Sequence, residues 1–464
     1  MESRLRGRHG NEGIAMTDVA DRPELRGGIP RDKAPVPTLG TRPITGERYT
    51  SRAFADLEWE RLWTKVWQIA GRVDQLAAAG DYLTVQLGRE SILISRGDDD
   101  RIRAFYNVCQ HRGNKLVHAE RGSLAAGQFQ CAYHGWRFAN DGELKWVYCE
   151  EDFPQGTPCG KRNLAEIPCD TWGGFVWVNM DETCRSLQEY LHPIAQHLDC
   201  YEMETMARTH WVTLEGDFNW KCVQDNFNES YHLPYVHPQS LWALNEHYTG
   251  CQFDMYPTMH ARMMMPGGGP GPQYTGKADR TFTSMEQEFT FWEFDPEPYR
   301  ENLAGLRVAM QQRKRELGAA KGYDFSRYSD EQLTDHYHYT AFPNVSFSMK
   351  PDGCIFLMSR PHPNGDPNMC EFDMWYLTKF PHGVKEYFSN SMRDWVAVDH
   401  QAQHERGKVG EVSCGPGIDQ DVAIWSTQQS GLRSRGFRGE YIPTQEHRVR
   451  YFHDNINRML GLEV

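Results

Sequence analysis

Four residues in two short loops form the pattern with the clearest chemistry. Cys109 and His111 stand in the first loop, and Cys131 and His134 stand in the second. One cysteine and one histidine from each of two loops is the ligand set of a Rieske [2Fe–2S] cluster, in which two thiolates hold one iron and two imidazoles hold the other. A structural zinc site takes the same donor atoms, but zinc fingers usually pair Cys with Cys and His with His. The spacing therefore favours the iron–sulfur cluster over zinc.

A helix is predicted in the segment 219–237. Its apolar residues recur at the spacing of one helical face, namely Trp220, Val223, Phe227 and Tyr231. Another face of the same helix would bring Asp225, Glu229 and His232 together. Pro234 follows closely, so we expect the helix to end just beyond His232.

Two histidines close in the sequence, His232 and His237, are then expected to lie side by side, because the turn after the helix can return the chain. Two histidines and one carboxylate form the facial ligand set of non-haem Fe(II) oxygenases, which leaves coordination positions open for dioxygen. A lone histidine is more often an ordinary core or surface residue. The cluster motif upstream favours the iron site.

Both motifs resemble those of the ring-hydroxylating oxygenase large-subunit family. The segments 107–113 and 131–138 are similar to the Rieske domain of that family, although the insert 112–130 is a couple of residues longer than usual. The segment 219–237 is similar to the catalytic motif, which is Asn-Trp-Lys followed by Asp/Glu-Asn and a His-x4-His pair. The resemblance implies a Rieske [2Fe–2S] cluster, a mononuclear Fe(II) and O2 as co-substrate.

The resemblance also implies roles for individual residues. His232 and His237 match the two histidine ligands of the mononuclear iron. Glu229 stands where the family usually has Asp, and this acid links a Rieske histidine of the neighbouring subunit with an iron-ligating histidine. Asp225 belongs to the same motif and is a second candidate catalytic acid. In having Glu at position 229, the chain resembles the members of the family that attack quaternary ammonium compounds.

The third iron ligand must come from elsewhere in the chain. The segment 416–434 resembles the late helix of the family, in which an acid about two turns before Gln-x-Gly-Leu-x-Ser ligates iron. Asp421 matches that acid best, and Asp419 is the alternative. Asp419 also has the properties of a helix cap, since an acid at the start of a helix accepts backbone hydrogen bonds and complements the helix dipole.

The composition limits the class of protein. The chain has 464 residues, of which 39% are hydrophobic and 24% charged, as expected for a soluble globular protein of two domains. Its formal net charge of −13 argues against a nucleic-acid partner. No run approaches the roughly 18 apolar residues that span a bilayer, and no apolar signal segment is present, so we expect a cytoplasmic protein. The 12 cysteines are then expected to be reduced thiols.

We expect an α+β fold in three parts. Residues 1–45 are predicted to be a partly disordered arm. Residues 46–180 are predicted to form a small all-β Rieske domain after a leading helix. Residues 181–464 are predicted to form a catalytic domain in which helices flank an antiparallel sheet, as in helix-grip, START-like folds. The clearest strands are 82–87, 91–95, 174–179, 354–359 and 370–377, and the clearest helices are 187–198, 301–317 and 444–460.

The resemblance implies a terminal oxygenase that adds one or two oxygen atoms to an apolar or aromatic substrate. The alternatives are oxidative N- or O-dealkylation or hydroxylation of a quaternary amine and, without catalysis, a Rieske electron carrier. No flavin or nicotinamide fingerprint is present, so NAD(P)H is expected to act only indirectly, through a separate reductase or ferredoxin. A homotrimer, with or without small β subunits, also follows from the resemblance.

The residues that bind the small-molecule substrate are the least defined by the sequence. Phe227, Phe342 and Asn344 are candidates, because aromatic-rich stretches can line an apolar pocket. The run Met263-Met264-Met265 is a further candidate. Stretches of this kind are more often ordinary core, so both interpretations remain open here.

Overall fold

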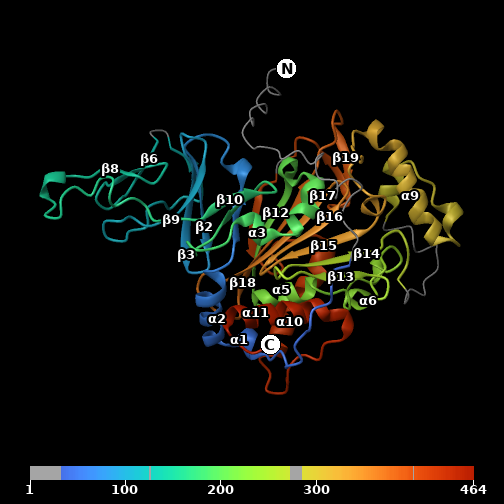
Figure 1. The fold of residues 1–464 in the computed structure, drawn as a ribbon. Coiled ribbons are helices and arrows are strands. Elements are labelled where there is room, and N and C mark those ends of the chain that lie inside the picture. Colours follow the sequence, from blue (N-terminus) through green and yellow to red (C-terminus); the bar gives the residue numbers. More distant parts are fainter. Residues whose placement is uncertain (1–32, 125–126, 272–284, 401) are drawn as a thin grey trace.

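The computed structural model describes most of the chain, namely residues 33–124, 127–271, 285–400 and 402–464 (Figure 1). The predicted arm at residues 1–45 therefore lies mostly outside the described residues, and its described part, 33–45, contains no helix or strand. Within the described ranges, no helix combines the length and the apolar character needed to cross a membrane.

Three small antiparallel sheets lie together at one end of the molecule (Figure 1, left). Their strand orders are β1-β11-β10, β5-β2-β3-β4-β9 and β6-β7-β8. The predicted strands 82–87 and 91–95 are confirmed as β2 and β3, which pair as a hairpin around Gly88, whose φ of +53° suits glycine. The bounds are β1 Gln68–Arg72, β2 Asp81–Leu87, β3 Glu90–Arg96, β4 Ile102–Tyr106, β5 Arg121–Ser123, β6 Gln128–Gln130, β7 Arg137–Ala139, β8 Leu144–Trp146, β9 Glu166–Ile167, β10 Cys169–Trp172 and β11 Phe175–Val178.

A large sheet of eight strands forms the other body, in the order β13-β14-β15-β16-β17-β18-β12-β21. Neighbouring strands are antiparallel except for β12 and β21, which pair in parallel, so the predicted antiparallel sheet is in fact mixed. The predicted α+β fold class is confirmed. The bounds are β12 Ala207–Gly216, β13 Gln252–Met255, β14 Ala261–Met265, β15 His336–Ala341, β16 Val345–Lys350, β17 Gly353–Pro361, β18 Cys370–Thr378 and β21 His404–Lys408, with a separate pair β19 Glu386–Ser389 and β20 Asp394–Ala397.

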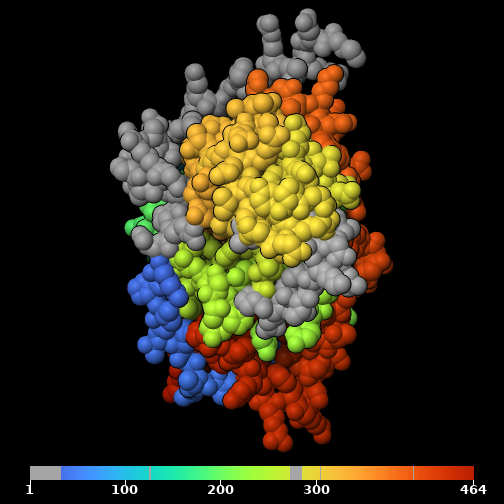
Figure 2. Space-filling view, turned by 90° about the vertical axis from the view of Figure 1, so that its right-hand side faces the viewer, coloured from blue at the N-terminus to red at the C-terminus, as the bar shows by residue number. Residues whose placement is uncertain are grey.

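Helices α5 (Trp220–Phe227), α10 (Pro416–Leu432) and α11 (His447–Leu460) lie below the large sheet in Figure 1. Phe227 and Trp425 attach α5 and α10 to the sheet, because both rings pack on Phe372 of β18, with ring centroids 6.5 and 5.3 Å away. Figure 2 shows α9 and its neighbours, in yellow to orange, bulging from the adjacent face above these helices. The remaining helices are α1 Glu47–Thr50, α2 Arg52–Glu58, α3 Leu187–Leu191, α4 Ile194–Leu198, α6 Leu233–Val236, α8 Glu286–Phe291 and α9 Leu303–Gly318.

Two of the three predicted long helices are confirmed. The prediction 301–317 corresponds to α9, and 444–460 corresponds to α11 after one 3-10 turn. The single helix predicted at 187–198 is instead the pair α3 and α4. Pro193 stands between them, and proline lacks the N–H that a continuous helix would need there.

The helix predicted to run through His232 is wrong. Helix α5 ends at Phe227, and a new short helix, α6, begins after His232. Pro234 lies in the first turn of α6, where its missing N–H costs nothing, so it helps to start a helix and does not end one. Tyr231, predicted on the apolar stripe, is 52% exposed because the chain has already left the helix.

The two bodies share one continuous apolar core. Phe175 of β11 stacks on Phe356 of β17, with ring centroids 5.0 Å apart, and on Trp375 of β18 at 6.2 Å. The Arg72 guanidinium of β1 lies over the same Phe175 ring, 4.9 Å from its centroid. These contacts fix the small sheets against the large one.

Helix α5 is held at its first turn by a buried ion pair. Lys221 Nζ lies 2.7 Å from Glu58 Oε1 at the end of α2, and the two side chains are 0% and 3% exposed. Asn219 caps the helix, because its Oδ1 accepts a hydrogen bond from Lys221 N at 3.0 Å. The Asn-Trp-Lys sequence therefore fixes the direction in which α5 approaches the site.

We expect Lys221→Ala to lower the free energy of unfolding by about 3–5 kcal/mol, because it leaves the Glu58 carboxylate buried and unpaired. Denaturant unfolding followed by circular dichroism would measure the loss. Lys65→Ala is the control, since Lys65 is 48% exposed and pairs with Asp181 at the surface. That change should cost less than about 1 kcal/mol, and equal small losses for both variants would contradict the prediction.

Candidate cluster and metal sites

The two predicted cluster loops come together at the tip of the small sheets. His111 Nδ1 lies 3.1 Å from His134 Nδ1. The Cys109 and Cys131 side chains contact each other, and they are only 2% and 1% exposed. Burial raises the pKa of Cys109 to about 11. The structure thus brings together two sulfur and two nitrogen donors, a set that fits a Rieske cluster.

Each loop is closed by a tight turn that requires glycine. Gly113 N donates to Cys109 O at 3.1 Å, and Gly135 N donates to Cys131 O at 3.0 Å. Both glycines have positive φ, +73° and +72°, which other residues rarely adopt. Trp136 stacks on the His111 ring with the planes 6° apart, so it fixes the orientation of that imidazole.

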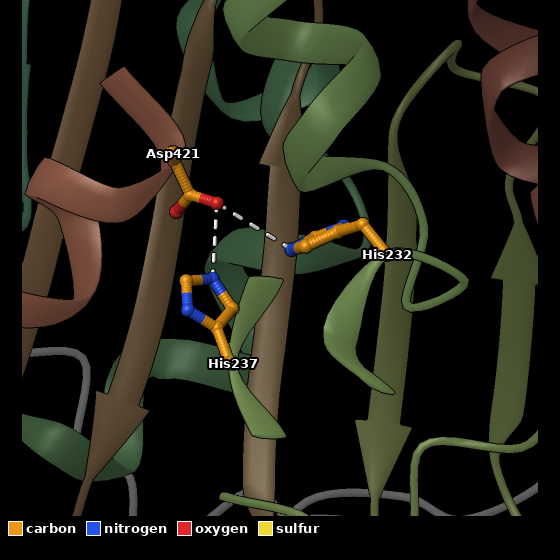
Figure 3. A group of neighbouring side chains, drawn as sticks. All are labelled: His232, His237 and Asp421. Carbon is orange, nitrogen blue, oxygen red and sulfur yellow. Dashed lines mark hydrogen bonds and ion pairs between the residues drawn. The ribbon is translucent and has the colours of Figure 1, made fainter. Parts of the chain in front are cut away.

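The second predicted site is also assembled (Figure 3). His237 Nε2 lies 2.9 Å from Asp421 Oδ1, and His232 Nε2 lies 3.6 Å from the same oxygen. The histidines stand at the two ends of helix α6, while Asp421 projects from the second turn of α10. Two imidazole nitrogens and one carboxylate thereby face a common point, as a facial metal site requires.

The far nitrogen of each ring is held by an acceptor. His232 Nδ1 lies 2.5 Å from Glu229 Oε1, and His237 Nδ1 lies 2.8 Å from Gln420 Oε1. Gln420 Oε1 also accepts a hydrogen bond from Gln239 Nε2. Because an amide oxygen can only accept, the hydrogen in its contact with His237 must be on His237 Nδ1. Hydrogens on the two Nδ1 atoms leave both Nε2 lone pairs directed at Asp421. Three acceptors that face one another call for a cation between them.

Glu229 is the acid closest to the histidine pair. Besides the His232 ring, it accepts hydrogen bonds from the backbone N–H groups of Tyr231 and His232. Burial alone would lower the pKa of His232, but the Glu229 carboxylate, followed by Asp421, raises it above its ordinary value. The two carboxylates therefore favour a cation at His232 Nε2, either a proton or a metal ion.

The two candidate third ligands take different positions. Asp421 is directed at the histidines, whereas Asp419 accepts hydrogen bonds from Cys414 N at 2.7 Å and Ser413 Oγ at 2.5 Å. Asp419 thus ties the first turn of α10 to the loop before it and is not the cap that its sequence position suggested, since the N-cap residue is Gly415. Gln420 between them was not predicted, because nothing in the sequence shows that it contacts His237.

Asp225 lies away from the pair, contrary to its predicted grouping with Glu229 and His232. The grouping required one continuous helix, but α5 ends two residues after Asp225. Its carboxylate instead contacts Tyr49 at 2.6 Å and His453 at 3.0 Å.

The three candidate pocket residues are dispersed. The Phe227 ring lies 5.8 Å from the ring of Trp425, which is one turn beyond Asp421 on α10. Phe342 is buried against Phe452 of α11, and the Asn344 amide donates to Ser359 O at 2.9 Å. Phe342 and Asn344 therefore make core contacts, and Phe227 alone of the three packs on the helix that carries Asp421.

Two family models match this chain. The model described as ring hydroxylating alpha subunit (catalytic domain) matches residues 203–462, which include His232, His237 and Asp421. The model described as Rieske [2Fe-2S] domain matches residues 66–159, which include both cluster loops. Together these matches cover both candidate sites.

Similar curated proteins act on two kinds of substrate, as their names state. The oxygenase subunit of glycine betaine monooxygenase from Pseudomonas aeruginosa is 30% identical over 43% of this chain and 45% of that protein. The large oxygenase component of the naphthalene 1,2-dioxygenase system from Ralstonia is 31% identical over 47% and 48%. The oxygenase subunit of carnitine monooxygenase from Escherichia coli K12 is 34% identical over 42% and 52%. The chain spans about half the length of these curated relatives in the matches.

Solved structures show the same fold. The quaternary ammonium Rieske monooxygenase CntA with L-carnitine aligns over 92% of this chain and 99% of that chain, with a TM-score of 0.63 and 19% identity. Naphthalene 1,2-dioxygenase with indole aligns over 90% and 92%, with a TM-score of 0.62 and 21% identity. With its fold and both family matches, this chain belongs to the ring-hydroxylating oxygenase alpha-subunit family and is a Rieske non-haem iron oxygenase.

Proposed function

We propose that the chain is the terminal oxygenase component of a multicomponent system. It adds oxygen from O2 to an apolar or aromatic organic substrate, with electrons from a separate reductase or ferredoxin. The proposal depends on one observation, which is that the Nε2 atoms of His232 and His237 and the Asp421 carboxylate face one another and are all hydrogen-bond acceptors. A Rieske domain in the same chain supports an electron supply to that point.

Seven residues are proposed to hold the two metal centres. Cys109, Cys131, His111 and His134 would bind the [2Fe–2S] cluster, and the histidine–carboxylate group would bind Fe(II). The chemistry supplied by these centres is single-electron transfer and the activation of dioxygen. The protein contributes the orientation of the rings, since Glu229 and Gln420 each hold the far nitrogen of one histidine.

The position of the two sites in one chain supports transfer of electrons between subunits. The strands next to the cluster loops, β6 and β8, lie at one end of the molecule, while α6 lies toward the opposite end (Figure 1). Both Rieske histidines are only half-buried, and the neighbouring Tyr133 is 56% exposed, so this tip is accessible to a partner. We propose a homotrimer in which the cluster of one subunit serves Glu229 and His232 of the next.

The proposed substrate lies against Phe227, the half-buried member of an aromatic group whose other two rings, Phe372 and Trp425, are buried and support it. The ring centroids of the three side chains are 5.3 to 6.5 Å apart. Aromatic faces favour a flat apolar substrate.

A second candidate substrate is a quaternary amine, and Glu229 is the observation that favours it. The relatives named glycine betaine and carnitine monooxygenase support this candidate. Aromatic faces also attract quaternary ammonium groups, so the same side chains suit either substrate.

Replacing His232 by Ala should abolish substrate-dependent oxygen uptake and leave the visible spectrum of the cluster unchanged. We expect about three irons and about two sulfides per chain in the wild type, and about two irons in the variant. Iron and sulfide analysis with a visible spectrum measures both centres. His382→Ala, at an exposed histidine of the same body, should keep its iron and its turnover. Retained turnover in His232→Ala would refute the site.

The two aspartates of α10 give a matched pair of variants. Asp421→Ala should lose the mononuclear iron and the oxygen uptake, because it removes the carboxylate that faces both histidines. Asp419→Ala should keep the iron and lower the free energy of unfolding by about 0.5–1.5 kcal/mol, the usual net contribution of a hydrogen bond, because it frees the loop before α10. Iron content and denaturant unfolding measure the two effects. The reverse pattern would make Asp419 the ligand.

Oxygen consumption with a surrogate reductase should distinguish the two candidate substrates. Arenes, phenolic ethers and N-methyl compounds would be compared at equal concentration. We expect uptake with arenes or phenolic ethers, and uptake with N-methyl compounds alone would favour the quaternary-amine candidate. A cluster that is reduced and reoxidised without substrate-dependent uptake of oxygen by any compound would point to an electron carrier.

A further inference from the structure

A second group of titratable side chains lies where four distant segments of the chain meet. Tyr49 comes from α1, Asp225 from α5, His453 from α11, and Glu440 from the segment between α10 and α11. Tyr49, His453 and Asp225 are 0%, 1% and 7% exposed, and Glu440 is half-buried. We call these four residues the buried quartet. No part of the proposed oxygen chemistry uses them directly.

The quartet is connected through the tyrosine hydroxyl. Tyr49 Oη lies 2.6 Å from Asp225 Oδ2, 2.7 Å from Glu440 Oε1 and 3.0 Å from His453 Nε2. His453 Nε2 also lies 3.0 Å from Asp225 Oδ1. All four contacts are within hydrogen-bond distance, so each needs a hydrogen between its two atoms.

The available hydrogens are too few if both acids are ionised. Burial lowers the pKa of His453 to about 3, so its ring is neutral and carries one N–H. With that hydrogen on Nε2, His453 donates to Asp225 and to the Tyr49 oxygen. Tyr49 has one hydroxyl hydrogen and can donate it to only one acid. The contact of Tyr49 with the other acid then lacks a hydrogen, unless that acid is itself protonated.

Glu440 is the better position for the additional proton. Asp225 is already placed to accept from both Tyr49 and His453, which favours its ionised form. A protonated Glu440 can donate to the Tyr49 oxygen, and Tyr49 can then donate to Asp225. This arrangement places a hydrogen in every contact of the quartet.

No cation replaces the proton among the described contacts. Lys221 is paired with Glu58, Arg48 donates to Asn457, and Arg450 donates to the carbonyl of Arg42. Burial raises the pKa of both acids of the quartet, Asp225 and Glu440, to about 7. The charged or titratable groups that face the quartet are Arg48 on α1, Glu58 on α2, Lys221 and Cys222 on α5, Glu229 after α5, Glu446 before α11 and Arg450 on α11.

We propose that the buried quartet holds one shared carboxyl proton, and that this proton fixes the end of α5 and thereby positions Glu229 against His232. Asp225 is the link, because α5 ends at Phe227 and Glu229 follows two residues later. The residues of the quartet are positioning residues, since none of them contacts the histidine–carboxylate group. The effect on turnover rests on the proposed function, but the proton itself does not.

From the shared carboxyl proton we can predict how the stability of the folded protein depends on pH. An acid whose pKa is higher in the folded than in the unfolded protein stabilises the fold below its unfolded value, and this contribution is lost as pH rises through the folded value. The wild-type denaturation midpoint should therefore fall between about pH 5 and about pH 8. Glu440→Gln keeps a hydrogen donor toward Tyr49 and cannot ionise, so the fall should be smaller in this variant. A part of the fall should remain in both proteins, because burial raises the pKa of Glu446 to about 8.

Kinetics would separate positioning from general stability. We expect Tyr49→Phe to lower kcat by about tenfold or more with little change in KM, because a small displacement of a reacting group has a large effect on rate. Glu440→Gln should retain most of the wild-type kcat, whereas Glu440→Ala should not. Tyr451→Phe is the matched control, since that buried α11 hydroxyl donates to a backbone carbonyl outside the quartet. It should leave kcat unchanged.

Two results would overturn the proposal. The first is an equal fall of the denaturation midpoint with pH in the wild type and in Glu440→Gln. The second is a metal ion in the quartet, since Asp225, Glu440 and His453 have ligand atoms within 4.8 Å of one another. Elemental analysis of the holoenzyme would reveal it as an additional metal that His453→Ala lacks. Stability is measured without turnover, so a wrong proposed function would leave this part of the test intact.

Discussion

The arrangement of the catalytic body depends on one constraint, which is that three acceptor atoms face one another. The Nε2 atoms of His232 and His237 converge on the Asp421 carboxylate, and such a group repels itself without a cation. The chain maintains it by holding both rings from behind, through Glu229 and Gln420. The fold brings the three residues together from α6 and α10, whose positions depend in turn on the large sheet and on α5.

Local patterns in the sequence predicted local structure well. The Cys-x-His and Cys-x-x-His loops, the β2–β3 hairpin and helices α9 and α11 all depend on neighbours a few residues away, so spacing and turn residues were sufficient. The prediction of a helix through His232 was wrong because it relied on periodicity alone. The apolar period continues through Tyr231, but α5 already ends at Phe227, and periodicity does not show where tertiary contacts end a helix.

Contacts between distant segments could not be predicted in the same way. The sequence left Asp419 and Asp421 as alternatives, because both stand at the start of one helix. Only the position of α6, whose histidines face Asp421, shows which of the two can be a ligand. Gln420 shows no signal of its contact with His237. Tyr49 and His453 are 404 positions apart, and neither belongs to a recognisable motif. Asp225 was predicted to lie with Glu229 and His232, but its partners come from parts of the chain that no spacing connects.

The aromatic contact between the two bodies has a consequence for how electrons travel. Domains joined by small polar interfaces usually move relative to each other, but Phe175 here is enclosed by Phe356, Trp375 and Arg72 within a shared core. The sheet β1-β11-β10 is therefore fixed on the large sheet, which disfavours a swing of the whole small body toward a distant acceptor. In the proposed trimer, the donor–acceptor separation would then be set by the way in which the subunits assemble.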